Sequence, residues 1–408
     1  MVKIGLEIHG YLNTKEKLFC NCKAEHGAKI TKPNTNICSI CTGQPGSKPM
    51  LPNKSAINKV IQISLLLNCD INESFSFQRK HYNWPDMPKG FQSTISGAHA
   101  IPVGVNGKFL GIGITECHLE EDPAAWNPKT GEIDYNRSGL PLVEIVTEPD
   151  FKSSEQVIEW LKQLISTLGY VKAINKKAGL KADVNISLPE KKGARIEIKN
   201  VNSLQNIKSV IEYEIKRQEK DVPSEQETRR FDDKKQITTK MRSKEEAQDY
   251  RFITEPDLPL IKINKKRINE IKNKLPETPF EKLDKLIKQH KLDKNTAEIL
   301  TKRLEIVEFF EKVIKKTNIN LAVKWIIIEL LSVLNYNKKE LDEVNIKPEH
   351  FIELLELLEE KKITELKAQE ILRSWINGSY SLKEKSGEFL QISREKEVKD
   401  FIEKVIQE

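Results

Sequence analysis

Residues 116–148 read ECHLEEDPAAWNPKTGEIDYNRSGLPLVEIVTE, and the rest of the chain is best understood from them. One predicted strand ends at the acidic residues Glu120, Glu121 and Asp122. The next, residues 142–146, is apolar like a buried strand except for Glu144 at its centre. A lone carboxylate is costly to bury unless a metal ion, a cation or hydrogen bonds satisfy it. Glu144 therefore marks a candidate functional site.

Two interpretations of these acidic residues are open at this point. Asp134, Asn136 and Arg137 lie between the two predicted strands. Several acids beside an Asn and an Arg suit a divalent cation that organises phosphate oxygens. In the alternative, Glu144 faces solvent on an edge strand and the acidic run caps a turn, because most acidic side chains are solvated.

The composition is that of a globular protein with a charged surface. The chain has 408 residues, 38% hydrophobic and 31% charged, enough for two or three domains. No apolar run approaches the roughly 18 residues of a membrane span, and the N-terminal MVKIGL predicts a strand rather than a signal peptide. We therefore expect a cytoplasmic protein with no membrane partner. The net charge of +7 is compatible with an RNA partner but does not require one.

Glycine usage divides the chain. Sixteen of the 18 glycines lie at or before Gly193, and none lies between Gly193 and Gly378. The first part therefore has the tight turns of a sheet-rich domain, whereas helical periodicity dominates from about Lys262. A break at Lys347-Pro348 marks a further boundary. The sequence predicts an α+β protein with domains at 1–262, 263–345 and 346–408.

Two more predicted strands carry polar side chains on one face. The opening KIGLEIHG alternates with period two, which puts Glu7 and His9 on the same side. Residues 180–188 alternate likewise and bring Asp183 and Asn185 to one side. The pair Glu7 and His9 is a weak metal signal alone, and a solvated strand face is its alternative.

Four of the six cysteines form two close pairs in the polar loop 20–41. These are Cys20 and Cys22, then Cys38 and Cys41. Two such pairs in a chain without a leader predict a structural zinc site rather than disulfides, since four thiolates complete a tetrahedral site. The alternative is four free thiols.

The segment 78–92, QRKHYNWPDMPKGFQ, interleaves cations, aromatics and prolines. Arg79, Lys80 and Lys89 in such a loop can hold a phosphate, and its aromatic rings can stack on a base. An ordinary surface turn explains the loop equally well.

A set of ordered motifs resembles the B subunit of the aspartyl/glutamyl-tRNA amidotransferases. The motifs run from residue 5 to residue 257, and the helical C-terminal part is similar more loosely. They are GLEIH at 5–9, RKHY at 79–82, HLEED at 118–122, IDYNRSGLPLVEI at 133–145, EPD at 148–150, DVNIS at 183–187, QETRRF at 226–231 and DYRFITEPD at 249–257.

The resemblance implies a fold and an activity. The fold would be a cradle-shaped mixed α/β domain followed by a helical domain and a helical tail. The activity would convert Glu-tRNA(Gln) or Asp-tRNA(Asn) to the amide: ATP phosphorylates the side-chain carboxylate, and ammonia then displaces phosphate. The ammonia would come from a glutaminase A subunit through a channel, with a small C subunit completing a heterotrimer.

The resemblance also implies site residues. His9, Glu121, Glu144 and Asp183 match the family's Mg2+ positions, with Glu7 beside them. Because Mg2+ rarely takes a histidine ligand, His9 would act through a bound water, or with Mn2+. Lys80 matches a lysine near the channel outlet and joins the catalytic set. Four further residues are expected to contact ATP or the acyl phosphate: Arg79, Lys89, Asn136 and Arg137. The four cysteines of loop 20–41 are expected to bind a structural Zn2+.

Other features of the sequence limit what this chain could do by itself. The sequence contains no P-loop and no amidase pattern of its own, so ATP would bind by another arrangement and the ammonia would need a partner. The family's tail continues past the segment that resembles residues 390–393, so we expect a shortened tail here. The competing hypotheses are a zinc-stapled RNA-binding protein without catalysis and a stand-alone ligase similar to ATP-grasp enzymes.

Overall fold

The structure is a computed structural model that describes residues 2–25, 32–82, 84–97, 99–175, 178–243 and 251–383. The chain forms two compact units, 1–276 and 277–408. Each is considered by itself. The expected tail segment at 390–393 and the start of the DYRF motif, Asp249 and Tyr250, lie outside the described residues.

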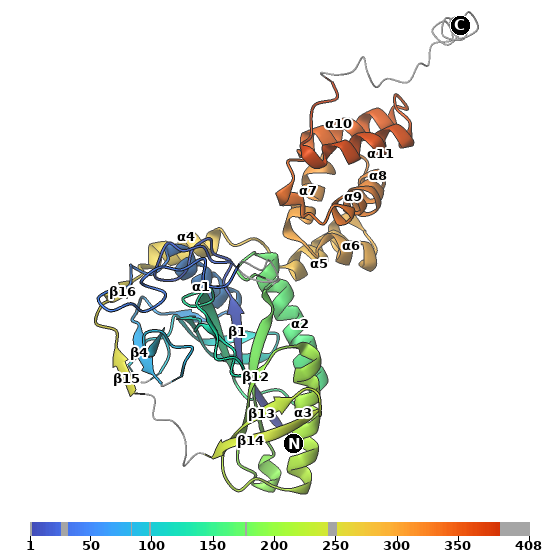
Figure 1. Ribbon diagram of the computed structural model, residues 1–408. Helices are drawn as coiled ribbons and strands as arrows, with labels where there is room; N and C mark the ends of the chain where they lie inside the picture. The colour runs from blue at the N-terminus through green and yellow to red at the C-terminus, as the bar shows by residue number, and fades with distance from the viewer. Residues whose placement is uncertain are drawn as a thin grey trace, which may run out of the picture. The chain divides into compact units, whose positions relative to one another are not determined.

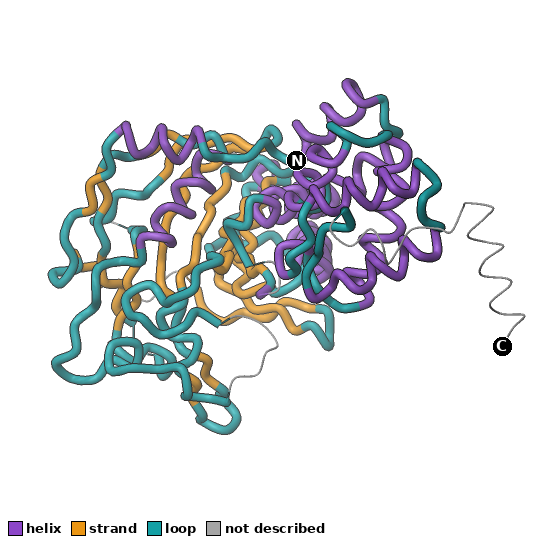
Figure 2. The backbone as a smooth tube through the Cα atoms, turned by 90° about the horizontal axis from the view of Figure 1, so that it is seen from above, coloured by secondary structure: helices purple, strands orange, loops and turns teal. Residues whose placement is uncertain are grey.

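The first unit is built on a 12-stranded sheet (Figures 1 and 2). Ten strands follow one another across it in the order β14-β13-β12-β11-β1-β10-β7-β5-β4-β15, and β6 and β2 extend it from β7. Its strands are β1 (Lys3–Tyr11), β2 (Asp70–Ile71), β4 (Gln78–His81), β5 (Phe91–Thr94), β6 (Gly104–Phe109), β7 (Ile112–Glu121), β10 (Pro141–Thr147), β11 (Leu180–Ser187), β12 (Ile196–Val201), β13 (Glu227–Asp232), β14 (Ile237–Ser243) and β15 (Arg251–Thr254). Two small pairs, β3 (Ser74–Phe75) with β16 (Ile261–Lys262) and β8 (Ala125–Trp126) with β9 (Ile133–Asp134), lie outside it.

β10 lies near the centre of the sheet. It pairs antiparallel with β1 on one side and with β7 on the other, and β1 pairs antiparallel with β11. The chain thus brings together strands that are far apart in sequence. The edge-strand interpretation of Glu144 is wrong, because both edges of β10 are hydrogen-bonded.

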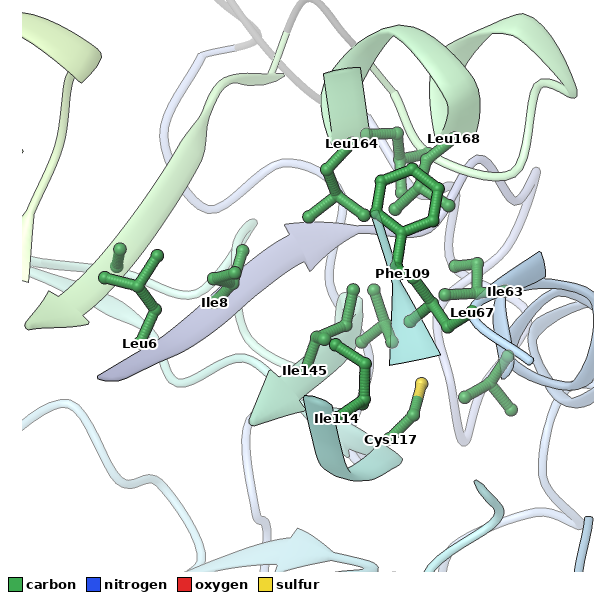
Figure 3. Packing of buried hydrophobic residues seen from close by; sticks show 14 of the residues in the cluster. Leu6, Ile8, Ile63, Leu67, Phe109, Ile114, Cys117, Ile145, Leu164 and Leu168 are labelled. Carbon is green, nitrogen blue, oxygen red and sulfur yellow. The ribbon is translucent and has the colours of Figure 1, made fainter. Parts of the chain in front are cut away.

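One face of the sheet is the hydrophobic core. Alternate residues of the central strands are buried on this face, among them Leu6, Ile8, Ile145 and Cys117 (Figure 3). Helices supply the opposite side of the core with side chains such as Ile63, Leu164 and Leu168. These helices are α1 (Lys54–Leu66), α2 (Ser154–Tyr170) and α3 (Leu204–Lys220).

The starts of these helices follow from side-chain capping. Asn53 accepts hydrogen bonds from the backbone at the start of α1, Ser153 does so for α2 and Ser203 for α3. The cap of α2 is thus Ser153 rather than the adjacent Ser154. Helix α2 continues past Gly169 and ends at Tyr170.

The second unit is helical. It comprises α5 (Pro279–His290), α6 (Lys294–Leu300), α7 (Leu304–Val313), α8 (Ile319–Lys324), α9 (Leu331–Tyr336), α10 (Pro348–Glu359) and α11 (Glu365–Ser374), with a π-helical stretch, Trp325–Leu330, joining α8 to α9. Helices α6 and α7 are separate, because the backbone is extended at Arg303.

One helix of this unit qualifies as a membrane span by length and composition alone. It is Ile319–Tyr336, 18 residues with a mean hydropathy of 1.4, although no run of this length was expected from the sequence. Its side chains Trp325, Ile326 and Leu330 are buried inside the helical unit, so the core accounts for part of this hydropathy.

The boundary between the units lies after Pro276 rather than after residue 262. Helix α4 (Lys265–Asn273) packs against α1, and Ile271 is buried in the core of the first unit. The helical periodicity of residues 265–273 gave no sign that this helix belongs with the sheet. The further boundary expected at 345 stays a prediction.

Candidate active site

The other face of the sheet is polar at its centre. Since side chains alternate along a strand, the residues between the core positions project together on this face. His9 of β1 lies opposite Glu144 of β10, which lies opposite His118 of β7. Glu7, two residues from His9, lies opposite Asp183 of β11. Four strands thus contribute to one cluster.

The central group of this cluster is His9, Glu120 and Glu144, whose ligand atoms all lie within 4.8 Å of one another. His9 Nε2 is 3.4 Å from Glu120 Oε1 and 3.6 Å from Glu144 Oε2. His118 Nε2 lies 2.7 Å from the same Glu144 oxygen. Two carboxylates and an imidazole at this spacing can bind a divalent cation.

Burial and neighbouring charges shift the pKa values of all three residues in this group. Burial alone would lower the pKa of His9, but Glu144 and Glu120 raise it to about 10. Burial alone would raise the pKa of Glu144, but His118 and His9 hold it well below its ordinary value. Burial and the neighbouring Glu144 raise the pKa of Glu120. A bound cation would relieve the repulsion between the two carboxylates.

A second acidic group adjoins the first. It consists of Glu7, Asp183 and Glu197, again within 4.8 Å of one another. Lys199 Nζ lies 2.9 Å from Asp183 and 2.6 Å from Glu197, so this group already contains a cation. Burial, followed by Glu144 and Asp183, raises the pKa of Glu7.

The four cysteines of loop 20–41 converge. Their Sγ atoms all lie within 4.8 Å of one another, and the Cys38 and Cys41 sulfurs are 3.9 Å apart. The edge of a tetrahedron with Zn–S bonds of about 2.3 Å is about 3.8 Å, so the cysteines fit zinc. A hydrogen bond from Cys20 is the main cause that lowers the pKa of Cys41 to about 5. Lys17, 1% exposed, places its Nζ 3.5 Å from the Cys41 sulfur.

Comparison with known families assigns both parts of the chain. Residues 2–269 match the GatB/GatE catalytic domain, and residues 308–408 match the GatB domain. The chain belongs to the B-subunit family of the aspartyl/glutamyl-tRNA amidotransferases. The first match contains every residue of the polar cluster.

Curated relatives in this family are similar over most of their length. The B subunit of the aspartyl/glutamyl-tRNA(Asn/Gln) amidotransferase of Methanocaldococcus jannaschii is 44% identical over 384 residues, 91% of this chain and 80% of the relative. That of Methanococcus maripaludis strain C5 is 43% identical over 388 residues, 92% of this chain and 81% of the relative. That of Methanosphaera stadtmanae is 41% identical over 373 residues, 90% and 80% of the two chains.

The structure divides the predicted metal set of this B-subunit family member. His9 and Glu144 lie together as expected, but their third partner is Glu120, not Glu121. Neighbouring residues of a strand face opposite ways, so Glu121 projects away from the polar face. Its carboxylate accepts hydrogen bonds from Lys89 Nζ and from the Ser93 backbone N–H. Asp183 lies in the second acidic group instead of the first.

The predicted cations divide between two environments. Lys80 lies close enough to Glu120 to lower the pKa of that carboxyl, against the larger effect of burial. Arg79, the preceding residue of β4, donates two hydrogen bonds to Glu255 and one to Asp257. Its guanidinium also lies 4.3 Å from the centre of the Phe91 ring. Of these three predicted cations, Lys80 is thus the one brought to the central group, while Arg79 and Lys89 are held in ion pairs.

Asn136 and Arg137 brace the cysteine loop and its surroundings. Asn136 accepts a hydrogen bond from the Asn36 backbone and donates one to the Lys32 carbonyl. Arg137 donates to the carbonyl oxygens of Pro123 and Ala124 and pairs with Asp122 at 3.3 Å. These contacts are structural, and a contact of either residue with ATP stays a prediction.

Five residues of these sites were absent from the predicted set. His118 and Glu120 alternate with the core residues Cys117 and Leu119, so the period-two pattern of ECHLE contained the signal that selects them. Glu197 and Lys199 alternate in the same way in β12. Lys17 gave no signal in the sequence, because its partner sulfur is 24 residues away.

Proposed function

We propose that this chain is the component that activates and amidates the amino acid in a tRNA-dependent amidotransferase. ATP would phosphorylate the side-chain carboxylate of a misacylated tRNA, and ammonia would replace the phosphate. The observation that supports this most is the His9–Glu120–Glu144 group at the centre of the sheet, within the part of the chain that matches the catalytic domain.

The chemistry accounts for the kind of site required. A free carboxylate acylates ammonia poorly because oxide is a poor leaving group, whereas phosphate is a good one. Phosphoryl transfer depends on positioning and charge neutralisation more than on covalent chemistry by the protein. A sheet with both edges of its central strands paired provides rigid positions for such groups.

In this proposal His9, Glu120 and Glu144 hold a divalent cation, and a bound Mg2+ would neutralise charge on the transferred phosphoryl group. Lys80, close to Glu120, would contact the phosphate or the acyl phosphate. Glu7 and Asp183 complete the acidic border, with Lys199 supplying a fixed positive charge. The cradle shape inferred from the family would place the acceptor end of the tRNA on this polar face.

The proposal includes partners and a second metal. As the family implies, the ammonia would come from a glutaminase A subunit, with a small C subunit in a cytoplasmic heterotrimer. The four cysteines would hold structural Zn2+, which would fix the loop that Asn136 and the Cys38 backbone already order.

The test uses the purified chain with its A and C partners, misacylated tRNA, Mg2+, labelled ATP and either glutamine or ammonium. We expect ADP and amide to form, and Glu144→Gln to reduce both by on the order of 100-fold or more. Glu132→Gln, at an exposed glutamate bonded to Thr130, serves as the matched control. Absence of turnover with every misacylated tRNA, in an intact complex with bound zinc, would favour a zinc-stapled RNA-binding protein instead.

A further inference from the structure

His118 lies fully buried beside the central group. Its exposed fraction is 0%, and its Nε2 lies 2.7 Å from Glu144 Oε2. Its other ring nitrogen, Nδ1, is a buried polar atom without a hydrogen-bond partner in the described part of the chain. The nearest acid on that side is Glu116, whose Oε1 is 3.7 Å away. Since only Nε2 has a close acceptor, the proton of the imidazole belongs on Nε2, facing Glu144.

Packing alone does not explain a histidine at this position. A buried polar atom without a partner costs about 1–3 kcal/mol, and an apolar side chain on β7 would avoid this cost. Residues that break such a local rule are concentrated at functional sites. The unsatisfied nitrogen of His118 therefore points to a role for its other nitrogen.

The hydrogen bond from His118 restrains a single oxygen of Glu144. Both histidines approach Oε2: His118 at 2.7 Å and His9 at 3.6 Å. Within the described ranges of the chain, the structure shows no hydrogen bond to the second oxygen, Oε1. The hydrogen bond thereby holds the carboxylate in one orientation, with Oε1 available to a cation.

We propose that His118 is a positioning residue, which orients the Glu144 carboxylate for cation binding through the Nε2–H hydrogen bond. The expected effect of His118 on catalysis rests on the proposed function, whereas its expected effect on cation binding does not. Partners that orient a metal-binding side chain typically change metal affinity or activity by about 10–100-fold.

The experiment compares three variants at His118 in the purified complex. The amide nitrogen of Gln reaches about as far as Nε2 of His, whereas that of Asn reaches only as far as Nδ1. H118Q therefore keeps a donor near Glu144, H118N keeps an amide that does not reach it, and H118F fills the ring volume without any donor. Mn2+ binding is followed by electron paramagnetic resonance without tRNA or ATP, and thermal melting reports the fold.

We expect H118N and H118F to bind Mn2+ about 10–100-fold more weakly than the parent protein, and H118Q to recover most of the affinity. In the amidation assay, kcat should fall in H118N and H118F while KM for tRNA stays close to that of the parent. H118N or H118F with parental Mn2+ affinity would overturn the inference. So would a folded H118Q with both of the other variants unfolded, because His118 would then serve the fold alone.

Failure of the proposed function gives a different pattern. If the parent complex binds Mn2+, loses it in Glu144→Gln and amidates no tRNA, the proposed function fails while the role of His118 stands. If the parent complex shows no Mn2+ binding that depends on Glu144, the inference itself is overturned.

Discussion

Glu144 shows how a carboxylate is kept ionised inside a sheet. Its side chain is 14% exposed, yet His118 and His9 approach one of its oxygens from the two neighbouring strands. A charge buried to this degree is stable only when such partners satisfy it. The same partners hold the pKa of Glu144 low, so the group is an anion ready to bind a cation.

The adjacent residues Glu120 and Glu121 should respond oppositely to the same substitution. Glu120→Gln removes a charge from the central group and should lower kcat for ADP formation by on the order of 100-fold with little change in stability. Glu121→Gln breaks the pair with Lys89 and should lower the free energy of unfolding by about 1–3 kcal/mol. Kinetics and urea unfolding of both variants test this. A greater kinetic loss in Glu121→Gln would restore the set inferred from the sequence.

The buried Lys17 should tune the cysteine site. Four thiolates around Zn2+ carry a net negative charge, and the Lys17 ammonium beside the Cys41 sulfur offsets it. Lys17→Met keeps most of the side-chain volume and removes the charge. We expect zinc to be released to a chelator about 10–100-fold more readily than from the exposed control Lys15→Met. Equal release from both variants would show that Lys17 is not coupled to the metal.

Whether a site residue could be predicted depends on how far apart in the sequence it and its partners lie. Glu7, His9, Glu144 and the four cysteines were identified because strand alternation and short cysteine spacing are local properties. The resemblance assigned the position to Glu121 rather than to its neighbour Glu120, and an offset of one residue along a strand reverses the face. Arg79 could not be separated from Lys80, because its acidic partner Glu255 lies 176 residues later.

At the scale of elements, the positions of strands and helices could be predicted from the sequence. Which strands pair with one another could not. Strand β10 extends the predicted strand 142–146 by one residue at each end. The run of apolar residues determines these bounds. The order of strands in the sheet depends on contacts between distant segments, so the pairing of β1 with β10 and β11 had no local signal.

The ion pairs of Arg79 join β4 to the segment that follows β15. Arg79→Met should lower the free energy of unfolding by about 3–5 kcal/mol, because it leaves Glu255, which is 3% exposed, without its partner. The double variant Arg79→Met/Glu255→Met should be less destabilised than Arg79→Met alone, since no unpaired charge remains. Urea unfolding measures both. A raised KM for ATP in a variant that stays fully stable would instead support the predicted contact of Arg79 with the nucleotide.

At the scale of the whole molecule, the sequence predicted a sheet-rich part followed by a helical part. This coarse division is confirmed by the two units and by the two family matches. The distribution of glycines along the chain was the basis for predicting this division. The position of the boundary was wrong because α4 packs on the sheet unit, and packing partners leave no mark in local periodicity.

The stability of the metal-free chain should depend on pH through His9. Its pKa is about 10 in the folded chain and about 6.5 when unfolded, so the folded state holds the proton more tightly. This contribution to stability is complete below about pH 6.5 and is lost as the pH rises towards 10. Within that window the free energy of unfolding should fall by at most about 1.4 kcal/mol per pH unit from this group.

Urea unfolding of the sheet unit between about pH 6 and pH 10, in buffer without added Mg2+ or Mn2+, measures this slope. His9→Gln should flatten it, because no proton is then taken up at this position. Mn2+ should stabilise the parent chain most at the alkaline end, where it no longer competes with the proton for the imidazole. A slope that His9→Gln leaves unchanged would show that His9 is not the titrating group, and that the charge balance of the central group differs from the one described.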